Sequence, residues 1–395
     1  MISRAWIRQT SPSRRLPLVE RLAAAIVRLR ADATRRPDCG GRAGMTWVVD
    51  GNVLGFVESA GMFDPVACAR LAADTRAAID RQTRQLDLRR RWGRVRECHG
   101  DLHLRNICLF DGAPTIFDGV EFNEDISCID VLYDLAFLLM DLWRRRLPRH
   151  ANAVFNEYMA ATDEIDGLCL MPLFLSCRAA VRAKTSASAA RVQSDTARRS
   201  EAEAAARQYL ELAERFLRPP PVRLIAIGGF SGSGKSTLAR GLAPGIGAAP
   251  GALVVRSDVL RKSLLGVSPL KQLGPEGYAP EATRSVYRLI AERALVALKA
   301  GHAVIADAVF AGPEDREAIA GVARDEGVPF SALWIDAPPE ILARRTADRF
   351  ADVSDATADV VRRQIQSGTG PLDWRRVDGS EDVDTVLRRA QTFLS

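Results

Sequence analysis

Lysine is scarce in this chain of 395 residues, although lysine and arginine together number 55. The sequence contains only five lysines, and none of them precedes His99. Arginine therefore supplies most of the formal net charge of +6. The arginine runs at 89–91 and 144–146 have no interleaved aromatic residues, which favours solvated helix faces over surfaces that stack nucleic-acid bases.

Cysteine is absent from the second half of the chain. All seven cysteines lie between residues 39 and 177, and no two of them are spaced as C-x-x-C. The spacing excludes a conventional zinc site and predicts buried, reduced thiols, so we expect a cytoplasmic protein. No apolar run approaches the ~20 residues that a membrane-spanning helix needs, so no contact with a membrane is expected.

A triple proline at 219–221 separates two kinds of sequence pattern. Such a run cannot continue a helix and favours an extended spacer, so we predict a domain boundary there. Residues 1–218 form a mainly α domain, with a strand or hairpin expected at 47–53. Residues 222–395 form an α/β domain with a parallel sheet covered by helices. Its strands are expected at 222–228, 253–257, 303–307, 330–335 and 375–378.

The most specific motif is a glycine-rich loop between the first of these strands and a helix beginning at Lys235. It reads G-x-x-x-x-G-K-[ST] without a mismatch, and its expected nucleotide-binding residues are Gly229, Phe230, Ser231, Gly232, Ser233, Gly234, Lys235, Ser236 and Thr237. Backbone N–H groups of such a P-loop surround a phosphate, Lys235 reaches the β- and γ-phosphates, and Ser236 ligates Mg²⁺. ATP and Mg²⁺ are therefore the expected cofactors. The alternative is a Gly/Ser turn that happens to contain a lysine.

Two aspartates follow the next two strands. Asp258 is placed to accept a proton from a substrate hydroxyl, or alternatively to cap the helix expected at 259–265. Asp307 is placed to orient Mg²⁺ beside Ser236, or alternatively to stabilise a turn. Arg345 and Arg349 share one face of a helix expected at 339–349, where they could close over phosphates or form a solvated basic face.

These motifs resemble the P-loop kinases of the gluconate kinase, polynucleotide kinase and zeta-toxin type. The resemblance rests on G-F-S-G-S-G-K-S, R-S-D-x-x-R-K, A-D-A-V-F and an arginine-rich lid that ends R-R-Q, and it covers about the last 170 residues. It implies phosphorylation of a hydroxyl group, with Asp258 as the base and Arg261 as a residue that holds the substrate.

The first half carries a second kinase motif. His99–Asn106 reads H-G-D-x-x-x-x-N, and an apolar strand ends at Asp118 twelve residues later. In protein-kinase-like folds this spacing lets Asp101 take the substrate proton while Asn106 and Asp118 hold metal. The motif resembles the aminoglycoside phosphotransferase family.

One part of that family's pattern is missing from this sequence. The 98 residues before His99 contain neither lysine nor a G-x-G-x-x-G loop, so we expect a protein-kinase-like C-lobe without its N-lobe. Either the chain is a shortened version of a longer product, or the domain has lost autonomous kinase activity. Asp101, Asn106 and Asp118 are thus expected to be a vestigial or a second site. The two halves together resemble bacterial proteins described as bifunctional aminoglycoside phosphotransferase/ATP-binding proteins.

The preferred interpretation is a Mg²⁺-dependent phosphotransferase that moves the γ-phosphate of ATP to a small-molecule hydroxyl at the P-loop site. Lys235, Asp258, Arg261, Arg345 and Arg349 are its expected catalytic residues. The alternative is an ATPase or nucleotide-gated regulatory protein with a pseudokinase-like N-terminal binding module. A kinase acting on nucleic-acid ends is permitted by the basic residues near Asp258 but is less favoured.

Overall fold

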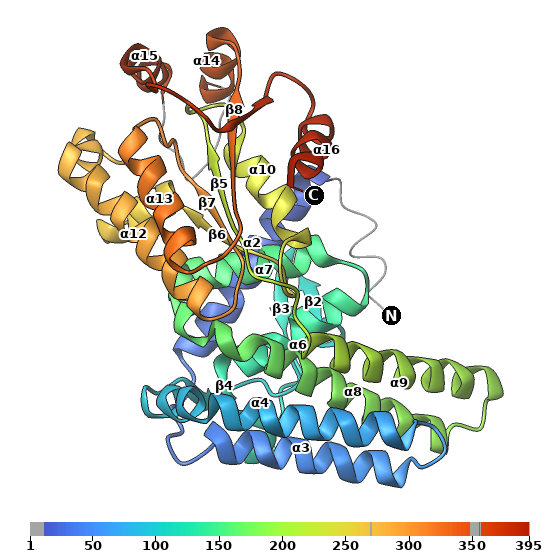
Figure 1. The fold of residues 1–395 in the computed structure, drawn as a ribbon. Helices are drawn as coiled ribbons and strands as arrows, with labels where there is room; N and C mark the ends of the chain where they lie inside the picture. The colour runs from blue at the N-terminus through green and yellow to red at the C-terminus, as the bar shows by residue number, and fades with distance from the viewer. Residues whose placement is uncertain (1–11, 269–270, 348–354, 356, 395) are drawn as a thin grey trace. The chain divides into compact units, whose positions relative to one another are not determined.

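The computed structural model describes residues 12–268, 271–347, 355 and 357–394 (Figure 1). The chain divides into two compact units. The first comprises Met1–Pro220 with Ala248–Pro250, and the second comprises Pro221–Gly247 with Gly251–Ser395. Among the residues described, no helix combines the length and the apolar character needed to cross a membrane.

The first unit is built mainly from helices, as the sequence predicts. They are α2 (Pro12–Ala31), α3 (Gly41–Glu58), α4 (Pro65–Arg91), α5 (Glu124–Ser127), α6 (Val131–Arg144), α7 (Pro148–Thr162), α8 (Met171–Val192) and α9 (Thr196–Phe216), with 3₁₀ turns η1 (Leu104–Asn106) and η2 (Glu164–Leu170). Asp64 caps α4 by accepting a hydrogen bond from Val66 N at 3.0 Å, directly before the N-terminal Pro65. This cap and the proline fix the start of the longest of these helices.

The strand or hairpin expected at 47–53 is wrong, because these residues lie within α3. The buried residues Met45, Val48, Asn52 and Phe56 recur at helical spacing along this segment. Gly55 of the same helix serves close packing rather than a turn, since a Cβ there would lie 2.9 Å from the Lys184 side chain of α8. Tertiary packing therefore overrides the β-branched composition of the segment.

Arg89 lies at the centre of a buried cluster of ion pairs in the first unit. Its guanidinium group donates to Asp130 Oδ2 at 2.7 Å and to Glu164 Oε2 at 2.6 Å, and Arg89 has no exposed surface. Asp130 also caps α6 through Leu132 N. Removing one partner would leave a buried charge uncompensated, so the cluster fixes how α4, α6 and η2 meet.

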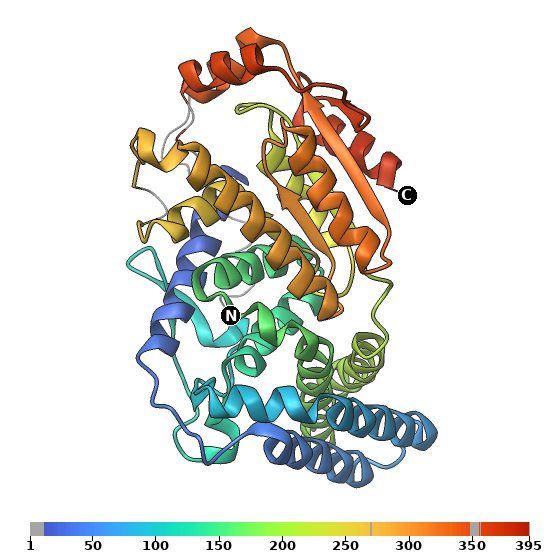
Figure 2. The ribbon, with the colours of Figure 1, turned by 60° about the vertical axis from the view of Figure 1, so that its left-hand side comes forward.

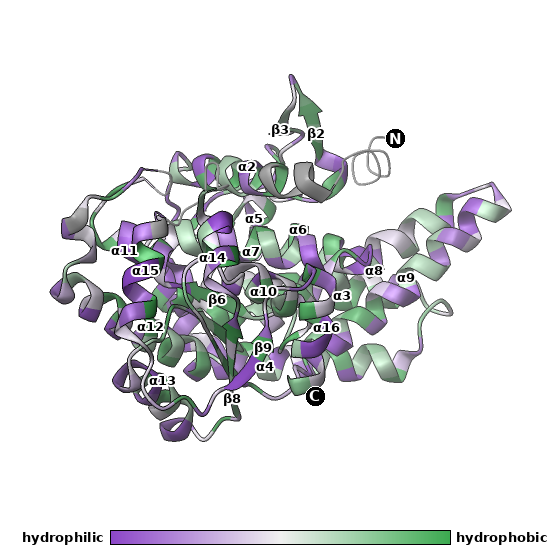
Figure 3. Cartoon of the chain, turned by 90° about the horizontal axis from the view of Figure 1, so that it is seen from above, coloured by the Kyte–Doolittle hydropathy of each residue, from purple (hydrophilic) through white to green (hydrophobic). Residues whose placement is uncertain are grey.

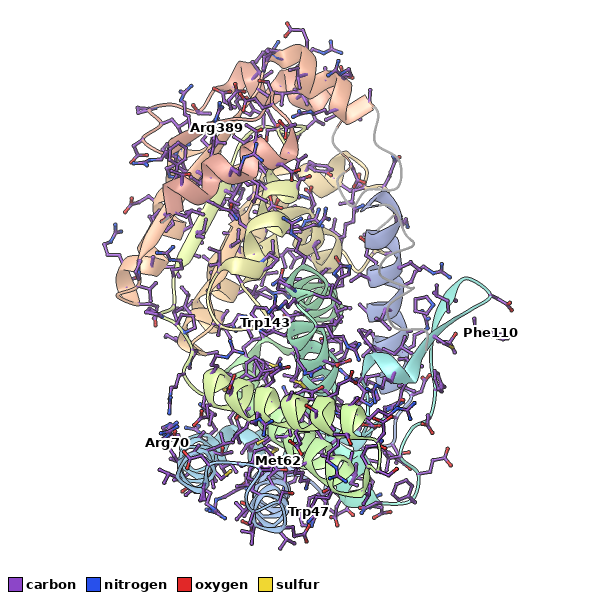
Figure 4. All side chains as sticks on the ribbon, turned by 90° about the vertical axis from the view of Figure 1, so that its right-hand side faces the viewer. Trp47, Met62, Arg70, Phe110, Trp143 and Arg389 are labelled. Atoms are coloured by element: carbon purple, nitrogen blue, oxygen red, sulfur yellow. The ribbon has the colours of Figure 1, made fainter. Side chains whose placement is uncertain are left out.

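Strands in the described part of the first unit form two antiparallel pairs. They are β1 (Val95–Glu97) with β4 (Cys128–Asp130), and β2 (Ile107–Phe110) with β3 (Ala113–Ile116). The β2–β3 hairpin extends outward, and its hydrophobic strand β2 stands out in Figure 3. Phe110 at its tip is 65% exposed and points into solvent (Figure 4). No larger sheet occurs in this unit among the residues described.

The second unit contains the parallel sheet that the sequence predicts. Its strand order is β6–β7–β5–β8–β9, and every pair is parallel. The strands are β5 (Leu224–Gly228), β6 (Leu253–Arg256), β7 (Val304–Asp307), β8 (Phe330–Asp336) and β9 (Arg375–Asp378). The strand order reverses at β5, so the carboxyl end of β5 is the topological switch point where α/β sheets bind ligands.

Helices cover both faces of this sheet (Figures 1 and 2). On one face α10 and α16 share a core with the sheet, in which Leu238, Leu387, Ile227 and Ile335 are buried together. On the other face α12 and α13 contact β6, β7 and β8. The helices are α10 (Lys235–Leu242), α11 (Ser257–Leu264), α12 (Pro280–Lys299), α13 (Pro313–Asp325), α14 (Pro339–Ala347), α15 (Ala358–Ser367) and α16 (Val383–Leu394), with 3₁₀ turns η3 (Ala243–Gly245) and η4 (Pro275–Tyr278).

Candidate functional site

The glycine loop leaves the carboxyl end of β5 and leads into α10. Gly229, Gly232 and Gly234 have φ angles of 138°, 87° and 101°, a region that glycine tolerates and other residues seldom adopt. A Cβ on Gly229 would lie 2.5 Å from the Ile335 carbonyl oxygen, and one on Gly232 would lie 2.5 Å from that of Leu342. The loop is therefore held so closely by its neighbours that glycine is required at both positions.

The loop opens onto a polar hollow that is continuous with solvent. Its walls come from the glycine loop, the first turns of α10 and α11, and the end of β7. The described residues that line it are Ser231, Gly234, Lys235, Ser236, Thr237, Arg240, Arg256, Ser257, Asp258, Asp307 and Val309. The structure thus gathers the predicted lysine, hydroxyl and two carboxylates around one space. Phe230 instead packs edge-on against Trp334, at a centroid distance of 5.4 Å.

Ser236 and Asp307 lie in direct contact within this hollow. Ser236 Oγ donates to Asp307 Oδ2 at 2.6 Å, and Arg256 Nε lies 3.5 Å from the same oxygen. Parallel pairing of β7 with β5 brings Asp307 beside Ile227, next to the start of the loop. Hydroxyl and carboxylate oxygens are the ligands that Mg²⁺ prefers, so these two residues fit the ion that the motif implies.

Asp258 lies in the first turn of α11, half-buried and facing the hollow. The alternative that Asp258 caps this helix is wrong, because α11 begins at Ser257 and Arg256 occupies the N-cap. A carboxylate inside the first turn still interacts favourably with the helix dipole. Its place beside Lys235 and Ser236 is compatible with proton transfer from a substrate hydroxyl, and that role stays a prediction.

Arg261 does not line the hollow. It is 7% exposed, and its Nη1 donates to the Gly277 carbonyl oxygen at 2.7 Å and to Thr283 Oγ1 at 3.3 Å. The guanidinium also lies 4.8 Å from the centre of the Tyr278 ring. Burial, together with the charges of Asp258 and Asp355, raises the pKa of Tyr278. Arg261 therefore holds η4 against α11, and contact with a substrate stays a prediction.

The predicted lid arginines fall on and beyond α14. Arg345 Nη1 donates to the Gly379 carbonyl oxygen at 2.7 Å, which ties α14 to the turn after β9. Arg344 is exposed on the same helix. Arg349 lies outside the described residues, and the described part of this helix ends at Ala347.

The sequence motifs do not predict two further residues near the P-loop, Arg240 at the hollow and Gln364 against the glycine loop. Arg240 lies one helical turn after Ser236 on α10 and lines the hollow; its i,i+4 spacing from Ser236 was the signal for it. Gln364 on α15 accepts a hydrogen bond from Ser231 N at 2.9 Å. The sequence shows Gln364 only as the last letter of an arginine-rich segment, so no local pattern predicts this long-range contact.

In the first unit the structure also brings the second kinase motif together. Asn106 Nδ2 donates to Asp101 Oδ2 at 3.1 Å and to the Asp101 carbonyl oxygen at 3.0 Å. The Phe117 amide donates to the Asn106 carbonyl oxygen at 3.0 Å, so the adjoining Asp118, with a φ of 61°, lies close to the loop. Asp101, Asn106 and Asp118 thus belong to one small region.

Buried acids of α6 hold this loop from behind. Gly100 N donates to Asp134 Oδ1 at 3.1 Å, and Leu104 N donates to Asp141 Oδ2 at 3.1 Å. The two aspartates that interrupt the apolar helix are therefore anchors for the loop backbone. Burial lowers the pKa of His103, whose ring packs edge-on against Phe137. Its Nε2 lies 3.4 Å from Asp101 Oδ2, so His103 packs behind the loop and contacts the motif's aspartate.

Two family models match the chain in consecutive segments. The model described as the phosphotransferase enzyme family matches residues 4–168, and the model described as an AAA domain matches residues 224–371. The first segment thus matches a phosphotransferase family, and the second, which contains the P-loop, matches an AAA domain. The resemblance to both kinase types is thereby confirmed.

Curated relatives align with most of the length of this chain. Uncharacterized proteins of Mycobacterium tuberculosis and Mycobacterium bovis are each 30% identical to it over 311 residues, which are 76% of this chain and 59% of the relative. The chain thus spans about three fifths of the length of these relatives.

Solved structures that resemble the second half include a sugar kinase from Janibacter and an APS kinase from Mycobacterium tuberculosis. The sugar kinase is 22% identical, with 44% of this chain and 95% of that chain covered and a TM-score of 0.33. The APS kinase is 21% identical, with 44% and 98% covered and a TM-score of 0.32.

Proposed function

We propose that the chain is an ATP-dependent phosphotransferase whose working site is the hollow at the P-loop. The observation that carries this proposal is that Lys235, the Ser236–Asp307 pair and Asp258 all face one polar space at the switch point of the sheet. A phosphate site, a cation site and a candidate base within one space are the components that phosphoryl transfer to a hydroxyl needs.

Each of these residues has a proposed task. Lys235 and the loop amides bind the phosphates, and Ser236 with Asp307 holds Mg²⁺. Bound Mg²⁺ neutralises charge on the phosphate oxygens. Asp258 accepts the proton of the acceptor hydroxyl, while Arg240 and Arg256 add positive charge to the walls. The acceptor is a hydroxylated small molecule, with a nucleic-acid end as the less favoured possibility.

The second candidate is an ATPase or nucleotide-gated regulatory protein, with the first unit as a binding module. The engagement of Arg261 with Gly277 and Tyr278 favours it, because the residue expected to hold an acceptor serves internal packing. Phosphate release from ATP without any acceptor, at an unchanged rate in Asp258→Asn, would support this candidate. We propose a cytoplasmic location, because all seven cysteines are free and thiols persist in a reducing compartment.

The decisive experiment follows γ-phosphate transfer from ATP to a library of hydroxylated metabolites by the wild type and by Asp258→Asn. Loss of a general base costs ~10²–10⁴ in rate, so we expect a single-turnover rate lower by that factor and an ATP affinity within a few-fold of the wild type.

A matched control is Asp384→Asn, which makes the same change in the first turn of α16. If Asp258 acts only on the helix dipole, both variants lose ~0.3–1 kcal/mol of stability in thermal melting and both keep their rate.

A further inference from the structure

One peptide unit of the glycine loop is held from both sides. Lys235 Nζ donates to the carbonyl oxygen of Phe230 at 3.0 Å, and the N–H of the same peptide, that of Ser231, donates to Gln364 Oε1 at 2.9 Å. Gln364 comes from α15, which is 133 positions away in sequence. The loop is therefore linked to a distant helix through a single side-chain amide.

This peptide unit lies in the part of the P-loop that faces the terminal phosphates of a bound triphosphate. The lysine of a P-loop reaches the β- and γ-phosphates, and here its ammonium group lies next to the bracketed peptide. Ser231 lines the hollow. Gln364 is thus hydrogen-bonded to a loop residue that lines the hollow in which a terminal phosphate group would bind.

The side-chain amide of Gln364 uses its oxygen as an acceptor, whereas its NH₂ group makes no hydrogen bond to a described residue. In a glutamine amide only the oxygen accepts hydrogen bonds, so the Ser231 N–H orients Oε1 toward the loop and leaves the NH₂ group with two donors. Neither donor forms a hydrogen bond with a residue that the structure describes, although the side chain is half-buried. Two N–H donors beside an anion site are suited to a phosphate oxygen.

We propose that Gln364 determines nucleotide specificity by recognising the γ-phosphate, with its oxygen on Ser231 N–H and its NH₂ group on the phosphate. The inference rests on the proposed function, because it requires ATP at the P-loop. A side chain that only braces the loop would need its oxygen alone.

The substitution Gln364→Glu separates a recognising role from a bracing one. Glutamate keeps an oxygen for Ser231 N–H but replaces the two donors with a second anionic oxygen. We expect the Kd for ATP·Mg²⁺ to rise at least about tenfold, since like charges oppose each other, while the Kd for ADP·Mg²⁺ changes less than about threefold. Titration calorimetry on the full chain measures both. Gln366→Glu, the same change at an exposed position of α15, is the matched control and should alter neither value.

Gln364→Ala removes the donors without adding charge. We expect it to weaken ATP binding more than ADP binding, so that the ratio of the Kd for ADP to the Kd for ATP falls. Thermal melting and the amide resonance of Ser231 report whether each variant remains folded. Equal effects of Gln364→Glu on ATP and ADP, or no effect of either variant on that ratio, would overturn the inference and leave the proposed function standing. If the wild type binds no ATP, the proposed function fails as well.

Discussion

Lys235 combines two tasks that no other lysine in the chain is placed to perform. Its ammonium group stabilises the glycine loop by donating to the Phe230 carbonyl oxygen. Lys235 also lines the same hollow as the Ser236–Asp307 pair. Lys184, the lone lysine in residues 1–220, is unsuited to the task. Its stem packs against Gly55 of α3, and burial lowers the pKa of its amine.

We therefore predict that Lys235→Ala strongly weakens nucleotide binding by the full chain. Deleting one partner of a desolvated charge pair costs ~2–5 kcal/mol, and each ~1.4 kcal/mol is a tenfold change. The Kd for ATP·Mg²⁺ should therefore rise at least about thirtyfold in titration calorimetry. Lys299→Ala is the control, because Lys299 is 61% exposed and pairs only at the surface with Glu326. Tight residual binding in Lys235→Ala would reveal a nucleotide site in the first unit.

At the scale of elements, the P-loop depends on α14 as well as on β5 and α10. Gly232 approaches the Leu342 carbonyl so closely that an added Cβ would have to displace α14 or the loop. Overpacking of this kind costs ~1–3 kcal/mol. We predict that Gly232→Ala lowers the melting temperature by several degrees and weakens ATP binding.

The control for this variant is Gly327→Ala. Gly327 has a φ of 64° but open space around its Cβ position, so it reports the backbone strain alone. Calorimetric melting of both variants should show the larger loss in Gly232→Ala. Equal losses would mean that the contact with Leu342 relaxes without cost.

The turn that begins β7 contributes a pH-dependent part of the stability of the second unit. Burial lowers the pKa of His302 to about 4, and its Nε2 bonds to the Gly251 carbonyl oxygen at 2.9 Å. The pKa in the unfolded chain is ~6.5, so the unfolded state binds the proton more readily. The contribution of His302 is therefore complete above pH ~6.5 and declines by up to ~1.4 kcal/mol per pH unit as the pH falls toward 4.

Melting temperatures of the wild type and His302→Gln between pH 7 and 4 test this assignment. Glutamine keeps an N–H donor for Gly251 but does not titrate, so the variant should lose less stability on acidification than the wild type. Parallel curves for the two proteins would show that other groups cause the acid sensitivity.

Elements with strong local signals could be predicted from the sequence, and long-range contacts could not. The strand–loop–helix pattern around Gly229 and the apolar strands of the sheet were predicted to within a few residues. The prediction of a strand or hairpin at residues 47–53 was wrong because their β-branched composition masked the helical spacing of Val48 and Asn52. Gln364 was missed because its contact with the loop joins segments far apart in the chain. At Arg261, the charge was visible in the sequence and its burial under Tyr278 was not.

In the molecule as a whole, the chain carries two kinase-type motifs, which differ in how many groups they offer to bind a triphosphate. The first unit assembles Asp101 and Asn106 on a loop held by buried aspartates. Its strands in the described residues form only two-stranded pairs, and its single lysine is packed between helices. The second unit supplies a glycine loop, a lysine and the Ser236–Asp307 pair in one hollow. Chemistry that depends on fixed donors therefore favours the second unit.

The final prediction follows from this inequality. In the full chain, Asp101→Asn should leave the rate of γ-phosphate transfer within about twofold of the wild type, whereas Lys235→Ala should reduce it to background. The reason is positional: Asp101 can accept a proton, but a poorly held γ-phosphate forfeits much of the ~7–11 kcal/mol that orientation supplies. Single-turnover assays of the two variants and of the double variant measure this. Residual transfer in Lys235→Ala that disappears in the double variant would make the protein bifunctional. Loss of transfer in Asp101→Asn alone would instead mean that both constellations act on one acceptor.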